Sequence, residues 1–71
     1  SMETKEAKKL DFDFNGKPVK VRIYEHAATH STRTEFSGLD LNRPLNITEL
    51  YALQDLVAQA IFVADGMEDR L

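Results

Sequence analysis

The chain has 71 residues, no cysteine and a formal net charge of −3 at neutral pH. This length allows one domain with a core of marginal size, and the lack of cysteine excludes disulfides and thiolate metal ligands. Because the lysines and arginines are not concentrated on one basic face, a nucleic-acid-binding protein is disfavoured.

The N-terminal segment is polar and has no apolar periodicity. It carries charged residues where a signal peptide would need an apolar stretch, and Ser1 before Met2 is interpreted as the remnant of a removed tag. We therefore expect a flexible tail over residues 1–9, a single α+β domain over residues 10–71 and a cytoplasmic location.

Two alternating runs predict a β-hairpin. Residues 10–14 alternate large apolar with acidic side chains, and residues 19–24 alternate β-branched with polar ones. Asn15-Gly16-Lys17-Pro18 separates the two runs. A period of two residues with one apolar side is typical of strands that rest one face on a core.

Two registers of this hairpin compete. A two-residue turn at Asn15-Gly16 is of the favoured primed type, but it places Lys9 opposite Arg22. A four-residue turn over residues 15–18 places Asp11 opposite Arg22 instead. Because like charges directly opposite each other disfavour pairing, the four-residue turn is predicted.

A third strand is predicted over residues 32–37, which alternate and are rich in residues compatible with β-structure. Residues 25–31 are expected to connect the second and third strands. Residues 39–44 are expected to form a loop that packs Leu39 and Leu41 on the core.

A long C-terminal helix is predicted from residue 47. Asn46 suits the N-cap, and Glu49 suits the third helical position of a capping box. Gly66 suits the position after a helix end, so the predicted helix ends near Asp65.

The predicted helix is apolar around too much of its circumference to be covered by one small sheet. At about 100° per residue, its large apolar side chains spread over roughly 260°, whereas a surface helix needs a stripe a little over 100° wide. The segment 25–45 can cover one flank but hardly both. We therefore predict a homodimer formed through the helix flanks, with the interface residues Ile47, Tyr51, Leu56, Ala58, Phe62 and Val63.

A metal site is considered at His26 and His30. Their spacing of four would place both imidazoles on one face of a helix, where a nearby glutamate could complete a zinc site. The zinc-protease motif needs a glutamate between the histidines, and Ala27-Ala28 stands there. Two solvated loop histidines are the simpler interpretation.

A small-anion site is considered in residues 29–34, which gather hydroxyl groups around an arginine. Such groups suit a phosphate, and His30, Thr32 and Arg33 are the residues to test. No glycine-rich turn accompanies them to bring backbone amides close to a ligand, so an ordinary hydroxyl-rich strand is the simpler interpretation.

The sequence thus predicts an α+β fold of order βββα: a hairpin and a third antiparallel strand packed against one long C-terminal helix. No residue stands in a recognisable nucleophile or acid–base context, so no enzyme and no cofactor are expected. The longest apolar run, residues 56–64, is shorter than the ~20 residues of a membrane span, so no membrane partner is expected.

The expected function is that of a small cytosolic protein-interaction module. It would be homodimeric and would bind and modulate a larger protein, as bacterial and phage accessory proteins do. The alternative is binding of a small phosphorylated ligand or a metal ion through residues 25–35.

Overall fold

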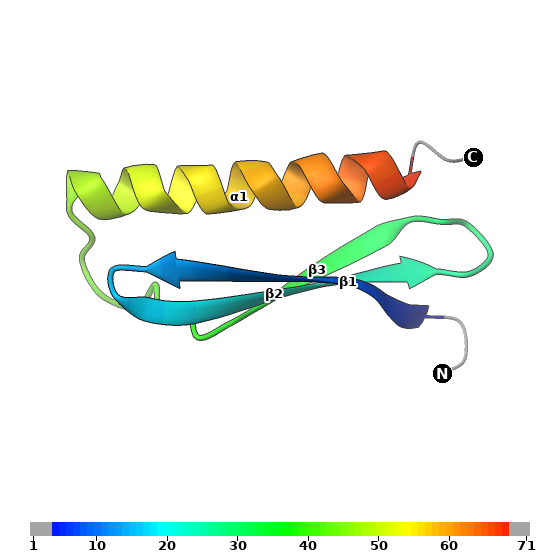
Figure 1. Ribbon diagram of the computed structural model, residues 1–71, viewed down its shortest axis with the longest axis horizontal. Coiled ribbons are helices and arrows are strands. Elements are labelled where there is room, and N and C mark those ends of the chain that lie inside the picture. The colour runs from blue at the N-terminus through cyan, green and yellow to red at the C-terminus, as the bar shows by residue number, and fades with distance from the viewer. Residues whose placement is uncertain (1–3, 69–71) are drawn as a thin grey trace.

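The computed structural model describes residues 4–68, which form three strands followed by one helix. The strands β1 (Thr4–Phe14), β2 (Lys17–His26) and β3 (Thr32–Ser37) make one antiparallel sheet in the order β1-β2-β3. The helix α1 (Ile47–Glu68) lies along one face of this sheet (Figure 1). The predicted α+β fold of order βββα is confirmed.

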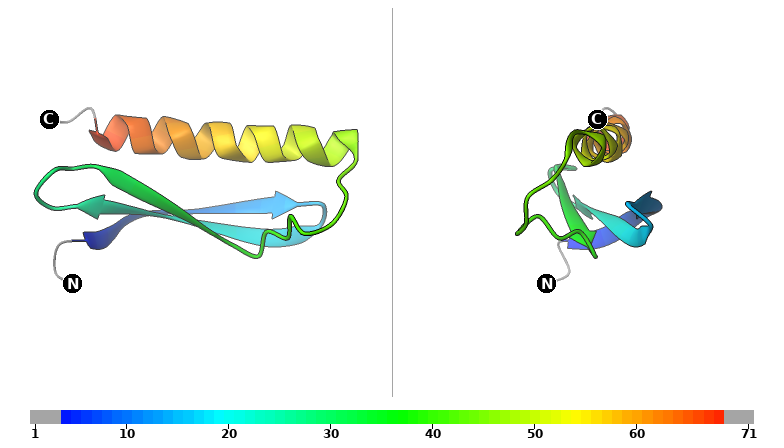
Figure 2. Two further views of the ribbon diagram at one scale, coloured as in Figure 1. Left: turned by 180° about the vertical axis from the view of Figure 1, so that it is seen from behind. Right: turned by 90° about the vertical axis from the view of Figure 1, so that its left-hand side faces the viewer.

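The core lies between the central strand β2 and α1. Val19, Val21 and Ile23 of β2 are completely buried and cluster with Leu56 and Ala60 of α1. The end-on view shows the helix on one side of the twisted sheet and no element on the other side (Figure 2). The molecule therefore has two layers, and one face of each layer is open to solvent.

The hairpin uses the two-residue turn, so the predicted register is wrong. Phe12 pairs with Val19 and Lys9 with Arg22, while Asn15 and Gly16 have φ angles of 53° and 79°. Both positive angles fit a primed turn, whose twist matches that of the strands. The like-charge pair is tolerated because carboxylates surround Arg22.

The Arg22 guanidinium lies 3.2 Å from Glu6 Oε1 and 3.8 Å from Glu35 Oε1. It also donates to Ser37 Oγ at 3.2 Å. Strands β1 and β3 thus both supply acceptors to the middle strand, and the pairing of Lys9 with Arg22 is not an isolated repulsion.

Strand β1 begins at Thr4, so the predicted tail is wrong for residues 4–9. These residues pair with β2 up to Thr4 opposite His26, with a bulge between Glu6 and Lys8. Their side chains are exposed, which explains why the sequence lacks an apolar pattern there. The rest of the predicted tail, residues 1–3, lies outside the described residues.

The third strand, predicted over residues 32–37, is confirmed as β3. It ends before Gly38, which has a φ of 88° and lies against β2: an added Cβ would stand 2.7 Å from the Pro18 carbonyl oxygen. In the following loop Leu39 packs against the core, but Leu41 is half-exposed, so that part of the loop prediction is wrong.

The helix starts where predicted and continues beyond the predicted end. Asn46 Oδ1 accepts from the Glu49 amide at 2.8 Å, and Glu49 Oε1 accepts from the Asn46 amide at 3.0 Å, which is the expected capping box. Gly66 lies inside α1, because Met67 after it is buried in the core. The burial of Met67 stabilises the last helical turn.

Candidate functional site

The face of α1 that points away from the sheet is exposed and mostly apolar; by helical spacing, Gln54 and Asp65 are its polar members. The exposed fractions are 80% for Phe62, 65% for Tyr51, 64% for Ile47, 58% for Ile61 and 47% for Leu50. Together with the exposed Ala58, these residues occupy a stripe about 120° wide at 100° per residue. We call this stripe the outer apolar face of α1; it consists of Ile47, Leu50, Tyr51, Ala58, Ile61 and Phe62.

The structure divides the predicted interface residues into two sets. Ile47, Tyr51, Ala58 and Phe62 belong to the outer apolar face. Leu56 is only 2% exposed, and Val63 is partly buried against the same core. Leu56 is therefore covered by its own sheet and cannot serve a partner in the folded chain, which corrects the prediction for that flank.

The inner face of α1 is covered mainly by β2, whose Val19, Val21 and Ile23 cluster with Leu56 and Ala60. The segment 25–45 covers the helix only in part. Phe36 of β3 is 37% exposed and Leu41 is 50% exposed, so these side chains leave part of their surface in solvent. Single exposed apolar residues are ordinary on monomers, but the outer apolar face of α1 brings five large exposed side chains together in one patch.

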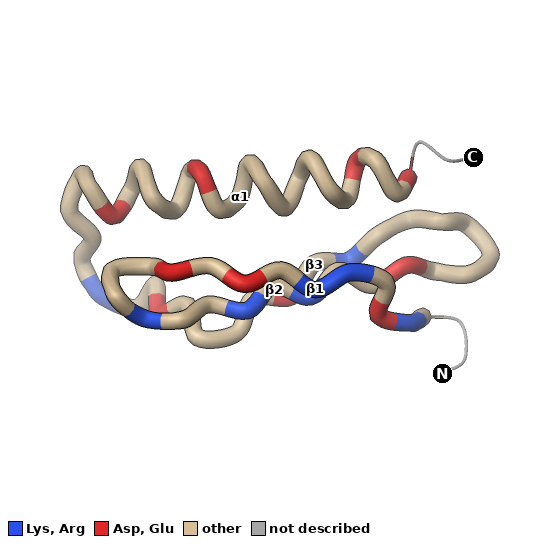
Figure 3. The backbone as a smooth tube through the Cα atoms, viewed as in Figure 1, with Lys and Arg blue, Asp and Glu red and all other residues tan. Residues whose placement is uncertain are grey.

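The described part of α1 has acidic residues and no basic ones. Figure 3 shows the helix with acidic positions only, while the lysines and arginines among residues 4–68 lie on the sheet and the connecting loop. Asp65 falls on the same side as the outer apolar face by helical spacing. A partner that binds this face would therefore contact apolar side chains, with negative charge near the C-terminal end of the helix.

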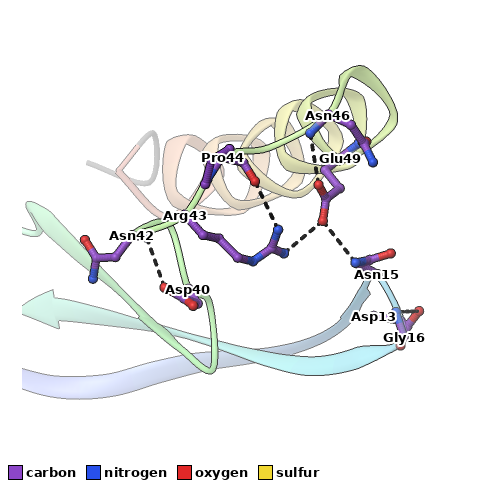
Figure 4. A network of polar contacts seen from close by, with 9 residues as sticks. All are labelled: Asp13, Asn15, Gly16, Asp40, Asn42, Arg43, Pro44, Asn46 and Glu49. Carbon is purple, nitrogen blue, oxygen red and sulfur yellow. Dashed lines mark hydrogen bonds and ion pairs between the residues drawn. The ribbon is translucent and has the colours of Figure 1, made fainter.

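A polar network fixes the N-terminal end of α1 (Figure 4). Glu49 is 6% exposed, and its Oε2 accepts from Arg43 Nη2 at 2.8 Å and from Asn15 Nδ2 at 3.0 Å. The hydrogen bond from Arg43, followed by that from the Asn46 amide, lowers the pKa of Glu49, and the same contact raises the pKa of Arg43. The sequence signalled the Asn46 contact but not those from Arg43 and Asn15.

This network sets the position of the outer apolar face. It joins the β1–β2 turn, the loop before α1 and the first helical turn, so the helix starts at a fixed point over the sheet. In the same loop Asp40 Oδ1 accepts from the Asn42 amide at 3.0 Å, which stabilises the turn that leads to Arg43.

By length and composition alone, α1 is also long and apolar enough to cross a membrane, which the shorter run 56–64 did not indicate. Most of its span is exposed in the folded chain. A helix that lies on a membrane surface usually carries Lys or Arg on its polar side, and α1 has neither from Ile47 to Glu68. Its charge therefore disfavours an anionic lipid surface.

The segment 25–35 does not gather the predicted ligand residues into one site. His30 Nδ1 lies 2.6 Å from Glu25 Oε2, so its imidazole is held by a carboxylate. Thr32 donates its amide and its hydroxyl to Glu68 Oε2, both at 2.8 Å. Arg33 Nη1 donates to the Thr32 carbonyl at 2.9 Å.

A hollow of about 150 Å³ lies beside Arg33 and is lined by Thr4, Tyr24, His26, Ser31 and Arg33. Partial desolvation, and next to it the Glu35 carboxylate, raise the pKa of Tyr24, which donates to Glu35 Oε1 at 3.3 Å. The hollow thus combines one guanidinium with hydroxyl groups and an imidazole, which suits a small anion.

The two histidines stand at a turn and not on a helix. His26 ends β2, and His30 has a φ of 61° in the connection to β3. His26 Nδ1 accepts from the Ala28 amide at 3.3 Å. Among residues 4–68, no group of three His, Cys, Asp or Glu side chains is placed to hold a metal ion.

Comparison with known proteins adds no relative: no family model, no curated protein and no solved structure matches the chain.

Proposed function

We propose that this protein is an interaction module that self-associates through the outer apolar face of α1. The supporting observation is the exposure of five large apolar side chains on one helix face, from 47% at Leu50 to 80% at Phe62. Burying this face against the same face of a second copy removes apolar surface of both chains from water. Each Å² of apolar surface buried contributes about 25 cal/mol of favourable free energy. The contact is isologous, because the same face serves both chains.

An antiparallel arrangement of the two helices fits the charges of α1. It places Asp65 of one copy beside the first turn of the partner's helix, where the helix dipole is positive. It also places the outer residues near Tyr51 opposite those near Ile61. A parallel arrangement would instead bring the two Asp65 carboxylates together. The acidic, base-free helix therefore favours the antiparallel pair.

The test is the mass of the protein in solution, measured by sedimentation velocity and equilibrium. Phe62→Glu places a charge at the most exposed position of the face and should halve the mass while the circular dichroism spectrum stays unchanged. Gln59→Glu is the matched control: it adds the same charge at an exposed position of α1 outside the face and should leave the mass as in the parent.

Two results would contradict this proposal. One is a parent protein that stays monomeric at high micromolar concentration. The other is an equal effect of the two substitutions, which would mean that added negative charge acts without regard to position.

Binding of a small anion is the second candidate function, and the hollow beside Arg33 favours it. Inorganic phosphate or a nucleotide would bind through the guanidinium with help from Ser31 and Tyr24. A thermal-shift titration with both should raise the melting temperature of the parent and not that of Arg33→Ala. No shift in the parent would remove this function.

A further inference from the structure

We propose that β3 is a joining edge at which two copies of this protein pair their sheets, with Thr34 of one copy opposite Thr34 of the partner. This contact uses a different surface from the outer apolar face of α1. It can therefore form whether or not the helices associate.

The two edges of the sheet differ in how they are protected. Strand β1 has a bulge between Glu6 and Lys8 and carries the exposed lysines Lys5, Lys8 and Lys9. Bulges and lysines are the devices by which edge strands avoid pairing with other chains. Strand β3 has neither: it contains no lysine or proline and pairs with β2 in continuous register.

The backbone of β3 offers unpaired groups at its free edge. The His26 amide bonds to the Ser31 carbonyl, so Ser31 faces β2, and the alternation of a strand turns Thr32, Thr34 and Phe36 outward. The outward amide of Thr32 is taken by Glu68, and its outward carbonyl accepts from Arg33 Nη1. Within the described part of the chain, the outward amides and carbonyls of Thr34 and Phe36 have no partner.

The charges of β3 select one register for a pair of such strands. With Thr34 opposite the partner's Thr34, Arg33 stands opposite the partner's Glu35, and this pair occurs twice because of the two-fold axis. Shifting the strands so that Thr34 meets the partner's Phe36 would place Glu35 opposite the partner's Glu35. The opposite shift would place Arg33 opposite the partner's Arg33. Of these three registers, only the central one is free of directly opposed like charges.

The side chains also suit this register. Arg33 and Glu35 lie on the face away from α1 and are exposed, so both are accessible to a partner. On the helix side, Phe36 is 37% exposed at the edge, and an added strand would place the partner's Thr32 beside it. The Thr34 pair itself is of a kind that stabilises antiparallel strands.

Two sheets of three strands joined in this way form one sheet of six, with both helices on the same side. Both outer apolar faces then point in the same direction. Two such pairs can meet face to face through their helices, which gives four chains with two kinds of contact. We therefore expect the parent protein to be a tetramer and Phe62→Glu to be a dimer held by β3.

Charge reversal in the Phe62→Glu background tests the β3 contact by itself. Adding Arg33→Glu opposes two glutamates, and adding Glu35→Arg opposes two arginines, so each protein should be monomeric by native mass spectrometry. Mixed in equal amounts, the two should form a heterodimer, because each glutamate then faces an arginine. A role of these residues only within their own chain would give no such rescue.

A second measurement does not depend on charge. The chain has no cysteine, and paired Cα atoms at a hydrogen-bonded antiparallel position lie about 5.5 Å apart, within the range of a disulfide. Thr34→Cys should therefore oxidise to a covalent dimer at low protein concentration. Thr48→Cys, at an exposed helix position outside both contacts, should not.

The outcomes separate this contact from the proposed function. If Phe62→Glu is monomeric, or if the mixed charge variants stay apart, the β3 contact is wrong and the helix contact can still hold. If the parent is a dimer that Phe62→Glu leaves intact and Arg33→Glu dissociates, the β3 contact stands and the helix contact fails.

Discussion

Glu68, in the last described turn of α1, accepts two hydrogen bonds from Thr32, the first residue of β3. The Thr32 amide and hydroxyl both lie 2.8 Å from Glu68 Oε2. These bonds, the hydroxyl first, lower the pKa of Glu68. The C-terminal end of the helix is thus tied to the sheet, as its N-terminal end is by Glu49.

Removing this tie should loosen the end of the helix without unfolding the protein. In Glu68→Ala the amides of residues 65–68 lose an anchored last turn, so their hydrogen exchange should become faster while the amides of β2 exchange as before. Asp55→Ala is the control, because the hydrogen bond that Asp55 accepts from Gln59 stays within the helix and does not reach the sheet. Equal exchange in the parent and in Glu68→Ala would contradict the anchoring role.

Acid should destabilise the protein through Glu49 and Glu68. Both carboxyl groups have a pKa lowered in the folded state, so folding favours their ionised forms. Their contribution is present above the unfolded-state pKa of about 4.3 and is lost as the pH falls through the lower folded-state values. The urea midpoint should therefore be level near neutral pH and fall below about pH 4.5.

Glu49→Gln separates the charge from the cap. Glutamine can still complete a capping box, so this variant loses mainly the ion pair with Arg43. Its urea midpoint should be lower than that of the parent at pH 7 and should change less on acidification. Parallel curves for parent and variant would show that Glu49 does not carry the acid sensitivity. Asn46→Ala, which removes the cap itself, should cost about 1 kcal/mol at either pH.

The three glycines should respond differently to alanine. Gly38→Ala should destabilise by more than ~1–2 kcal/mol, because the left-handed backbone and the Pro18 carbonyl 2.7 Å away both oppose a Cβ. Gly16→Ala has no such neighbour and should lose only the conformational part. Gly66→Ala, inside the helix with open space around it, should stabilise by about 0.5–1 kcal/mol. Chemical denaturation of all three tests this order.

Leu56 and Phe62 should behave in opposite ways when each is cut to alanine. Leu56 is 2% exposed, so Leu56→Ala should cost about 2–5 kcal/mol at every protein concentration. Phe62 is 80% exposed, so Phe62→Ala should change the stability of a single chain by no more than about 0.5 kcal/mol. Its effect should appear only at concentrations where chains associate, as a weaker concentration dependence of the melting temperature than in the parent.

Local signals of the sequence were sufficient for the order of elements, for β3 and for the start of the helix. The capping residues Asn46 and Glu49 act within four residues of each other, so the pattern contains all that is needed. The predicted hairpin register is wrong because the sequence shows Lys9 and Arg22 only as an isolated pair of like charges. In the fold, Glu6 and Glu35 from two different strands balance that charge.

The candidate site could be predicted only in part. Helical periodicity reveals surplus apolar surface, but it cannot tell which flank meets the sheet, so it predicts Leu56 and Phe62 in the same interface. The contacts of Glu49 with Asn15, 34 residues earlier, and of Glu68 with Thr32, 36 residues earlier, leave no local pattern. For the same reason the hydroxyl-rich sequence around Thr32 does not show that its amide and hydroxyl already donate to Glu68.

The bulge and the lysines of β1 have a consequence for solubility. A chain that adds to another at β3 leaves β1 strands as the only outer rims of the product, and these rims resist further addition. Strand-by-strand growth then terminates after a single step. The protein can therefore keep β3 as an unprotected edge strand without forming fibrils by continued strand addition.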